Sequence, residues 1–272
     1  MTVAARRLML AGGLLFALLA LVAAAAPWVA PHDPEAFETS RVMGAPTFAH
    51  PFGSDVLGRD VLSRVIYGLR VSVAVSLASV AISLVLAVPL GLAAGYFGSW
   101  ADSAISRSLD MILVLPAMLL AITFIAILGP GSTVATLAIA VIYLPILARV
   151  MRTSTLVVTR QEFIAGARAR GASHLQVLLG HVAPNALGPV IVQASILGAF
   201  ALQLEAGLSF LGLGVQPPTP SLGGMLAEGR DVLTVAPWVE IFPGLAIVLA
   251  VLAFTLLGEG LRRAFDPKGV AE

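Results

Sequence analysis

Residues 159–193 read TRQEFIAGARARGASHLQVLLGHVAPNALGPVIVQ, and this stretch decides how the fold is interpreted. It is polar and carries Arg160, Arg168 and Arg170, whereas long apolar runs dominate the chain on both sides. Two helix-like runs flank a glycine, and a proline follows within the second run. The pattern predicts two short helices joined by a glycine turn.

Three features mark the ends of these two short helices. Thr159 and Glu162 have the spacing of a capping box, and Ser173 and Gln176 repeat it. Gly171 lies between the helices, at a C-terminal position where a left-handed backbone favours glycine. We therefore expect a stiff pair of helices that a partner can grip.

The composition indicates that the rest of the chain lies in a membrane. It is 58% hydrophobic and 11% charged, with a mean hydropathy of +0.97. Soluble domains carry roughly 25% charged residues. The net charge of +1 gives no reason to expect a nucleic-acid partner, and the absence of cysteine excludes disulfides and Cys-ligated metal. Membrane lipid is therefore the expected surrounding.

A bilayer core requires about 20 consecutive apolar residues per helix. Six segments satisfy this requirement, at about residues 8–30, 71–97, 109–128, 133–150, 186–213 and 239–257. We therefore expect an all-α, polytopic membrane protein with six transmembrane helices.

The first apolar segment has a second interpretation, a cleaved signal peptide, because it follows Arg6 and Arg7 and ends near Ala24–Ala26. Its apolar run is longer than the 7–15 residues typical of that signal. Pro27 directly after the alanines also fits a peptidase site poorly. We interpret the segment as a retained helix.

Orientation follows from the distribution of lysine and arginine in the loops. With a cytoplasmic N-terminus, eleven of the 16 basic residues fall inside: Arg6, Arg7, Arg107, Arg149, Arg152, Arg160, Arg168, Arg170, Arg262, Arg263 and Lys268. The other five fall outside: Arg41, Arg59, Arg64, Arg70 and Arg230. Both termini are therefore expected in the cytoplasm, where the 159–193 stretch also begins.

The outside loop that precedes the second span changes character at Ser54. Prolines make its first half irregular, whereas Ser54 or Asp55 can cap a helix. Four apolar residues then recur every fourth position along one helical face: Leu57, Val61, Val65 and Leu69. Arg59, Asp60 and Arg64 fall elsewhere on the helix surface. Two interpretations remain open, an amphipathic helix on the membrane and a helix packed on the outer ends of the bundle.

We expect two parts in the chain. Residues 1–70 would form an anchor helix, a periplasmic loop and the interfacial helix. Residues 71–272 would form the transmembrane domain, with the polar segment at about 153–185.

Most catalytic chemistry is absent from the sequence. No G-x-x-x-x-G-K-[ST] motif occurs, so the chain has no P-loop. His32, His50, His174 and His181 all lie outside the apolar spans. His174 and His181 are seven residues apart, but no carboxylate cluster accompanies them, so we expect neither a metal site nor a bound cofactor.

Glu205 is the clearest charged residue inside an apolar span. An intramembrane carboxylate is by default a functional candidate, and Glu205 could line a translocation path or take a proton. The alternative is structural, in which Glu205 lies near the outer end of its helix and accepts hydrogen bonds from a neighbouring helix.

The polar segment resembles the cytoplasmic loop of ABC-transporter permeases, which carries E-A-A-x-x-x-G followed by I-x-L-P. Gly171 matches the glycine and Ala167 the second alanine. Ala165 and Gly166 stand in place of the usual glutamate and first alanine, and Pro184 is the only part of the second motif that is kept.

Four further stretches resemble the dipeptide/oligopeptide/nickel permease family, and within it the second of two permease subunits. They are FGSDVLGRDVLSRVIYGLR (52–70), ARARGAS (167–173), EAGLSFLGLGVQPPTPSLGGML (205–226) and GEGLRRAFDP (258–267). Together with the order of the spans they cover nearly the whole chain.

The resemblance implies a non-catalytic subunit of a bacterial inner-membrane importer. Its partners would be a homologous permease, two cytoplasmic ATPase subunits that use ATP and Mg²⁺, and a periplasmic or lipid-anchored binding protein. The loop that couples to the ATPases would include Glu162, Phe163, Ile164, Ala167, Arg168, Arg170, Gly171, Ser173 and Pro184. Dipeptides or oligopeptides are the expected cargo, with a nickel chelate or glutathione as alternatives. A self-sufficient secondary transporter would show several buried ionisable groups, and we find Glu205 alone.

Overall fold

The computed structural model describes residues 3–265, with side chains from residue 9 onward, and this part of the chain is helical without strands. The helices are α1 (Val3–Ala24), α2 (Ala26–Val29), α3 (Val61–Phe97), α4 (Ser99–Leu113), α5 (Ala117–Leu128), α6 (Ser132–Thr159), α7 (Glu162–Ala169), α8 (His174–Val177), α9 (Ala183–Phe210), α10 (Leu222–Arg230) and α11 (Trp238–Phe265). A 3₁₀ turn, η1 (Thr39–Arg41), lies in the loop before α3, and a π-helical turn, η2 (Leu178–Val182), joins α8 to α9.

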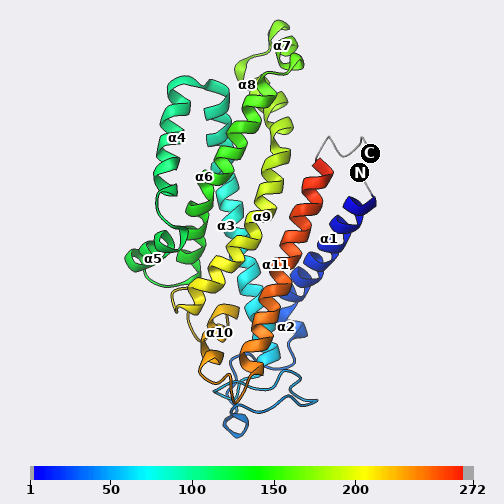
Figure 1. The fold of residues 1–272 in the computed structure, drawn as a ribbon, viewed down its shortest axis with the longest axis vertical. Helices are drawn as coiled ribbons and strands as arrows, with labels where there is room; N and C mark the ends of the chain where they lie inside the picture. Colours follow the sequence, from blue (N-terminus) through cyan, green and yellow to red (C-terminus); the bar gives the residue numbers. More distant parts are fainter. Residues whose placement is uncertain (1–2, 266–272) are drawn as a thin grey trace.

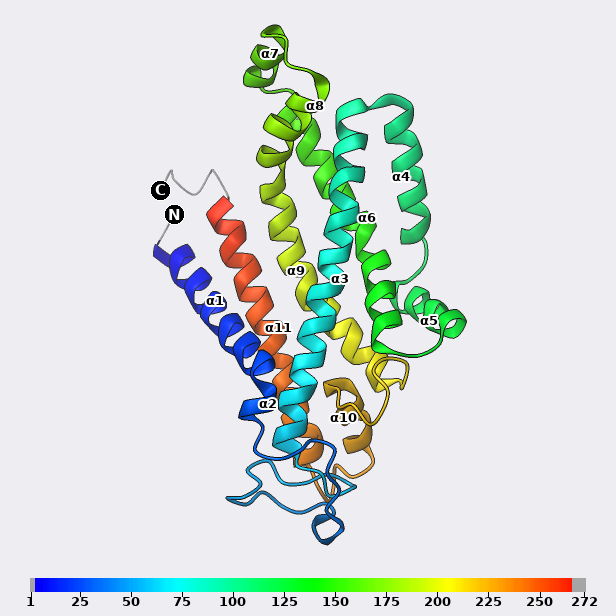
Figure 2. The same cartoon turned by 180° about the vertical axis from the view of Figure 1, so that it is seen from behind.

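Long helices run side by side along the molecule (Figure 1). The beginning of α1 and the end of α11 lie toward the end that carries α7, while the loop before α3 and α10 lie at the opposite end (Figures 1 and 2). We call these the α7 end and the α10 end. The short helix α7 projects beyond the ends of its neighbours.

Four helical segments of the described chain are long and apolar enough to cross a membrane: α3, α6, the continuous run from α8 to α9, and α11. The third expected span is not one straight helix, because α4 and α5 meet at an angle of 87° and pass the same test only as a pair. Pro116 is the physical reason, since it lacks an amide hydrogen and keeps the residue before it out of the helical region.

The first expected span ends earlier than predicted. Helix α1 has 22 residues and ends at Ala24, and the short helix α2 follows it, whereas the sequence predicts one span over about residues 8–30. Helix α1 packs along α11, where glycines allow close contact. A Cβ at Gly12 would lie 2.5 Å from the Leu257 backbone nitrogen, and one at Gly260 would lie 2.5 Å from Met9 Cα.

The centre of the bundle consists of α3, α6 and α9, which share one buried apolar core. Gly91 and Gly95 face the backbone of α6, where a Cβ would come within 2.5 Å and 2.7 Å of carbonyl oxygens. Ser83 donates a hydrogen bond to the Ala140 carbonyl of α6 at 2.7 Å, and Ser76 donates to Gly198 of α9 at 2.7 Å. Small residues and hydrogen bonds between helices are the usual means of packing helices in lipid.

The helix predicted to begin near Ser54 begins at Val61 instead, and it is continuous with the second span rather than separate from it. Asp60 caps α3 by accepting from the Ser63 backbone amide, and α3 runs without a break from Val61 to Phe97, so residue 70 lies inside it. Val61 and Val65 are buried in a second apolar core with α1, α10 and α11, which agrees with the packed interpretation. Arg59, Asp60 and Arg64, which the sequence places off the apolar face of the helix, are also buried.

Candidate functional site

The polar segment forms the two short helices that the sequence predicts, and one of their two expected caps is present. Ser173 and Gln176 form a capping box, with the Gln176 amide donating to Ser173 Oγ at 3.3 Å and the Ser173 amide to Gln176 Oε1 at 2.9 Å. Gly171 has a φ of +84°, as its place between the helices predicts. The Thr159 box is wrong, because α6 extends to Thr159, whose hydroxyl donates to the Leu156 carbonyl instead.

The apolar residues expected to contact a partner are divided between the inside and the outside. Ile164 and Ala167 are buried, 1% and 2% exposed, in the same core as Val177 and Val182. Phe163 is 46% exposed. Ile164 and Ala167 therefore hold α7 on the bundle, and Phe163 is the member of the three that faces outward.

The remaining predicted residues of the segment are exposed, and one of these, Arg168, contacts the bundle. Glu162, Arg170, Ser173 and Pro184 lie on the surface. The Arg168 guanidinium carbon lies 5.5 Å above the ring of Tyr96, a residue near the end of α3.

A second contact joins α8 to the end of α3. Tyr96 Oη and His174 Nδ1 lie 3.0 Å apart, so His174 is engaged in a hydrogen bond with an aromatic residue. Both short helices of the segment therefore contact Tyr96, one through a cation–π interaction and one through a hydrogen bond.

Glu205 lies fully buried in α9, toward the α10 end, and it is held by two serines. Ser72 of α3 donates to Glu205 Oε2 at 2.6 Å, and Ser209, one turn further along α9, donates to Oε1 at 2.7 Å. Among the described residues, no ion pair includes Glu205. The serines therefore supply the compensation that a buried carboxylate requires.

Next to Glu205 lies a buried ionic network that the sequence does not predict. Arg59 bonds Asp55 through Nε at 2.7 Å and Glu228 of α10 through Nη2 at 2.7 Å. Arg64 lies 3.1 Å from Asp55 and 3.0 Å from Glu228. Burial raises the pKa of Glu228, and the charge of Arg59 acts in the opposite direction. We call these four residues the outer ionic network, after the side of the membrane on which the sequence predicts the loop before α3 to lie.

A cavity of 190 Å³ lies between the outer ionic network and α9. Arg59, Arg64, Glu228 and Ser209 are among the residues that line it. Ser209 also donates its hydroxyl to Glu205, so a residue of the cavity wall contacts the buried carboxylate directly. The signal for this site in the sequence is the D-x-x-x-R spacing of Asp55 and Arg59, but nothing local points to Glu228.

Comparison with known protein families shows which family the chain belongs to. The model of the family described as binding-protein-dependent transport system inner membrane component matches residues 87–269. The chain belongs to this family of permeases. A second model, the N-terminal TM domain of oligopeptide transport permease C, matches residues 4–48 of the permease.

Individual relatives cover almost the whole permease. The di/tripeptide transport system permease protein DppC of Pseudomonas aeruginosa is 44% identical over 264 residues, which are 94% of this chain and 87% of the relative. The dipeptide transport system permease protein DppC of Alkalihalophilus pseudofirmus is 40% identical, covering 96% and 86% of the two chains. The glutathione transport system permease protein GsiD of Pectobacterium atrosepticum is 42% identical, covering 95% and 86%.

A solved structure shares the fold. It is a chain of the MetNI methionine ABC transporter in an inward-facing conformation, with a TM-score of 0.60 and 20% identity over 75% of this permease and 96% of that chain. The resemblance drawn from the sequence motifs is confirmed. The permease is an inner-membrane, multi-pass, non-catalytic subunit of an ABC transporter of the peptide/nickel family.

Proposed function

We propose that the permease carries dipeptides or short oligopeptides inward across the membrane, in a complex driven by ATP. The observation that carries this proposal is the 44% identity to a di/tripeptide permease across 94% of the chain. The binding protein would deliver the peptide to the α10 end, and two ATPase subunits would hydrolyse ATP at the α7 end. A homologous second permease would complete the translocation path.

The segment at about 153–185 would couple the permease to an ATPase. Its projection beyond the bundle and the exposure of Phe163 and Arg170 support this role. Phe163 would enter an apolar part of a groove on the ATPase, and Glu162, Arg168 and Arg170 would pair with charges around it. The Ser173 capping box and the Gly171 turn would make the segment stiff enough to transmit a displacement.

We further propose six spans with both termini in the cytoplasm. The broken pair α4–α5 and the N-terminal helix α1 would supply the two spans beyond the four long ones. The arginines of α6 and α7 belong to elements that lie toward the α7 end. The arginines of α10 and of the loop before α3 belong to elements at the opposite end, which agrees with the positive-inside rule. Residues 1–70 would then anchor the permease and shape its outer face, and residues 71–272 would form the transport domain.

The substrate path would pass close to Glu205. The support is the 190 Å³ cavity that reaches Ser209, which hydrogen-bonds to the carboxylate. An ammonium group of a peptide entering this region would meet Glu205 or Glu228. The carboxylate of a peptide would meet Arg59 or Arg64, so the outer ionic network could exchange its internal pairs for contacts with a zwitterion.

Glutathione transport is a second proposal, because relatives 42% identical carry that name. Glutathione is itself a tripeptide with one γ-linked residue, so it differs from a dipeptide with neutral side chains in its backbone linkage and in carrying one extra carboxylate. A nickel chelate remains the third alternative for a member of this family.

Uptake by a strain that lacks its own peptide and glutathione importers would distinguish these cargoes. The complete importer should be expressed with its binding protein, and uptake of a labelled dipeptide, tripeptide, glutathione and nickel compared side by side. We expect ATP-dependent uptake of the dipeptide or tripeptide, abolished by a Walker-A substitution in the ATPases. Glutathione or nickel uptake without peptide uptake would replace the proposal, and uptake by the permease alone would overturn its dependence on ATPases.

A further inference from the structure

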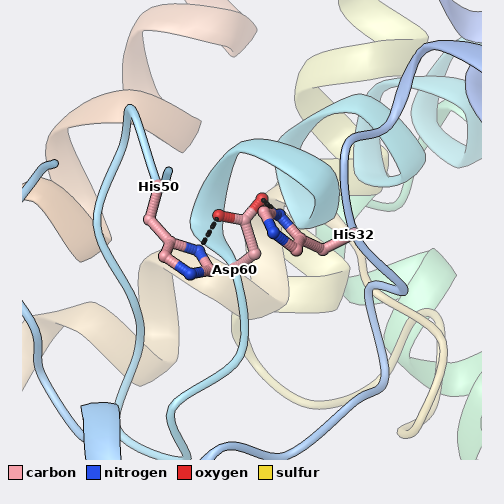
Figure 3. Close-up of side chains that lie close together, drawn as sticks. All are labelled: His32, His50 and Asp60. Carbon is pink, nitrogen blue, oxygen red and sulfur yellow. Dashed lines mark hydrogen bonds and ion pairs between the residues drawn. The ribbon is translucent and has the colours of Figure 1, made fainter. Parts of the chain in front are cut away.

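We propose that His32, His50 and Asp60 bind a divalent transition-metal ion such as Zn²⁺, which clamps the outer loop onto the beginning of α3. The three residues come from separate points of the chain. His32 follows α2, His50 lies in the middle of the loop, and Asp60 caps α3 (Figure 3).

The potential ligand atoms of the three residues lie close together. His50 Nδ1 is 2.8 Å from Asp60 Oδ1, and His32 Nδ1 is 3.7 Å from Asp60 Oδ2. Three potential ligand atoms, one from each residue, all lie within 4.8 Å of one another. Two ligands of a tetrahedral Zn²⁺, each about 2.1 Å from the ion, are about 3.4 Å apart. The observed distances, to the two oxygens of the Asp60 carboxylate, lie on either side of that value. The two rings are stacked with an interplanar angle of 20°, so they must turn about their Cβ–Cγ bonds before both in-plane nitrogen lone pairs point at one ion.

The surroundings fix the carboxylate and leave one side open. Asp60 accepts from the Ser63 backbone amide at 2.8 Å and from Ser63 Oγ at 2.7 Å, and this second shell orients it. The two imidazole rings stack with centroids 4.4 Å apart. His50 and Asp60 are buried, whereas the His32 side chain is 39% exposed. An ion can therefore enter past His32 and keep a water molecule as an additional ligand.

The donor set selects the class of ion. Two imidazoles and one carboxylate are suited to Zn²⁺ and its neighbours in the first transition row, whereas Ca²⁺ and Mg²⁺ prefer oxygen ligands throughout. Glu38 lies 4.0 Å from the other ring nitrogen of His50 but is paired with Arg41, so it is not counted as a ligand.

A clamp at this position would act on a region with little regular structure. Between Ala30 and Asp60 the described chain has one helical element, the 3₁₀ turn η1, together with irregular turns and an isolated β-bridge between Ser54 and Asp60. A bound ion requires deprotonated ligands and is therefore held less tightly as the pH falls. It joins residues 32 and 50 to the first turn of α3, the helix whose Arg64 belongs to the outer ionic network.

The test is Zn²⁺ binding by the full chain, purified in detergent, stripped with a chelator and titrated in a calorimeter. We expect one equivalent per chain in the wild type, and a loss of affinity of at least about tenfold in His32→Ala and His50→Ala. His181→Ala is the matched control, because His181 lies in η2 at the α7 end, and it should bind as the wild type does. His32→Ala keeps the proposal testable if His50→Ala misfolds, since the His32 side chain is partly exposed.

A second readout follows the loop itself. Arg41 lies between the two histidines and its side chain is 42% exposed, so trypsin can report on this region. We expect Zn²⁺ to slow cleavage after Arg41 in the wild type and in His181→Ala, and to have no effect in His32→Ala. Two results would overturn the proposal. The first is a wild-type protein, at about 1 μM, that binds no stoichiometric Zn²⁺ when the ion is in about 100-fold excess. The second is a His32→Ala variant that binds Zn²⁺ and is protected from trypsin as the wild type is.

Discussion

Replacing Gly12 by alanine, with Gly13→Ala as its matched control, tests whether α1 is packed against α11 as described. Both glycines lie in α1, but they face different surroundings. A Cβ at Gly12 would lie 2.5 Å from the Leu257 nitrogen and 2.6 Å from the Leu256 carbonyl carbon, whereas a Cβ at Gly13 meets nothing within 4 Å. The two variants therefore share the change in helix propensity and differ in the contact with α11.

The magnitude follows from that difference. Ordinary contact begins at 3.4 Å, so the Gly12 methyl group is 0.9 Å too close to backbone atoms, which cannot rotate away. Overpacking of this kind costs about 1–3 kcal/mol, while the gain from Gly to Ala in a helix is about 0.5–1 kcal/mol in both variants. We expect Gly13→Ala to be slightly more stable than the wild type, and Gly12→Ala to be about 1–3 kcal/mol less stable than Gly13→Ala.

Thermal unfolding of the full chain in one detergent would measure this difference. With shifts of about 2–4 °C per kcal/mol for a chain of this size, the two midpoints should differ by roughly 2–12 °C. Both variants should elute as the wild type does in gel filtration, which would show that they insert and fold. Equal midpoints, or a higher midpoint for Gly12→Ala, would mean that α1 does not rest on α11 through this seam.

Substitutions at three further positions test the coupling segment, the buried carboxylate of α9 and the outer ionic network. Gly171→Pro should abolish substrate-stimulated ATPase activity in the reconstituted importer without affecting insertion, because proline fixes φ near about −65° where Gly171 has +84°. Normal stimulation would contradict the coupling role. Gly180→Ala is the control, because a Cβ at Gly180 meets open space. Glu205→Ala should lower the free energy of unfolding by about 1–3 kcal/mol for each serine left without its acceptor. Glu205→Gln keeps an acceptor and should reduce uptake more than it reduces the unfolding midpoint. Unaltered uptake at limiting substrate would make Glu205 purely structural. Glu228→Ala should lower the free energy of unfolding by about 1–3 kcal/mol, which is below the range for fully buried pairs because the Glu228 side chain is 31% exposed. An unchanged unfolding midpoint would show that Asp55 alone suffices for both arginines.

The features that the sequence predicts well depend on neighbouring residues. Apolar runs locate the long helices, and the serine and glutamine three residues apart identify the start of α8. The same spacing fails at Thr159 because α6 continues to that residue, so its hydroxyl has a carbonyl of its own helix as partner. Pro116 is visible in the sequence, but an apolar run on both sides of it obscures the break.

The outer face could not be predicted because its contacts join distant parts of the chain. Glu228 bonds Arg59 across 169 residues and Arg64 across 164, and no periodicity connects these positions. His32, His50 and Asp60 meet because an irregular loop folds back onto α3. The amphipathic spacing of Val61, Val65 and Leu69 is real, but the apolar face it predicts is turned toward protein rather than lipid headgroups.

The unbroken course of α3 has a mechanical consequence. Its 37 residues extend about 55 Å at 1.5 Å per residue. One end carries the Asp60 cap and Arg64, and the other carries Tyr96, which contacts both α7 and α8. No loop interrupts this helix, although Pro89 inside it removes one backbone hydrogen bond. The Gly91–Gly95 contact with α6 lies within about one turn of Tyr96, so a tilt of α3 about that contact would move Tyr96 a little and Arg64, on the long arm, much further in the opposite direction.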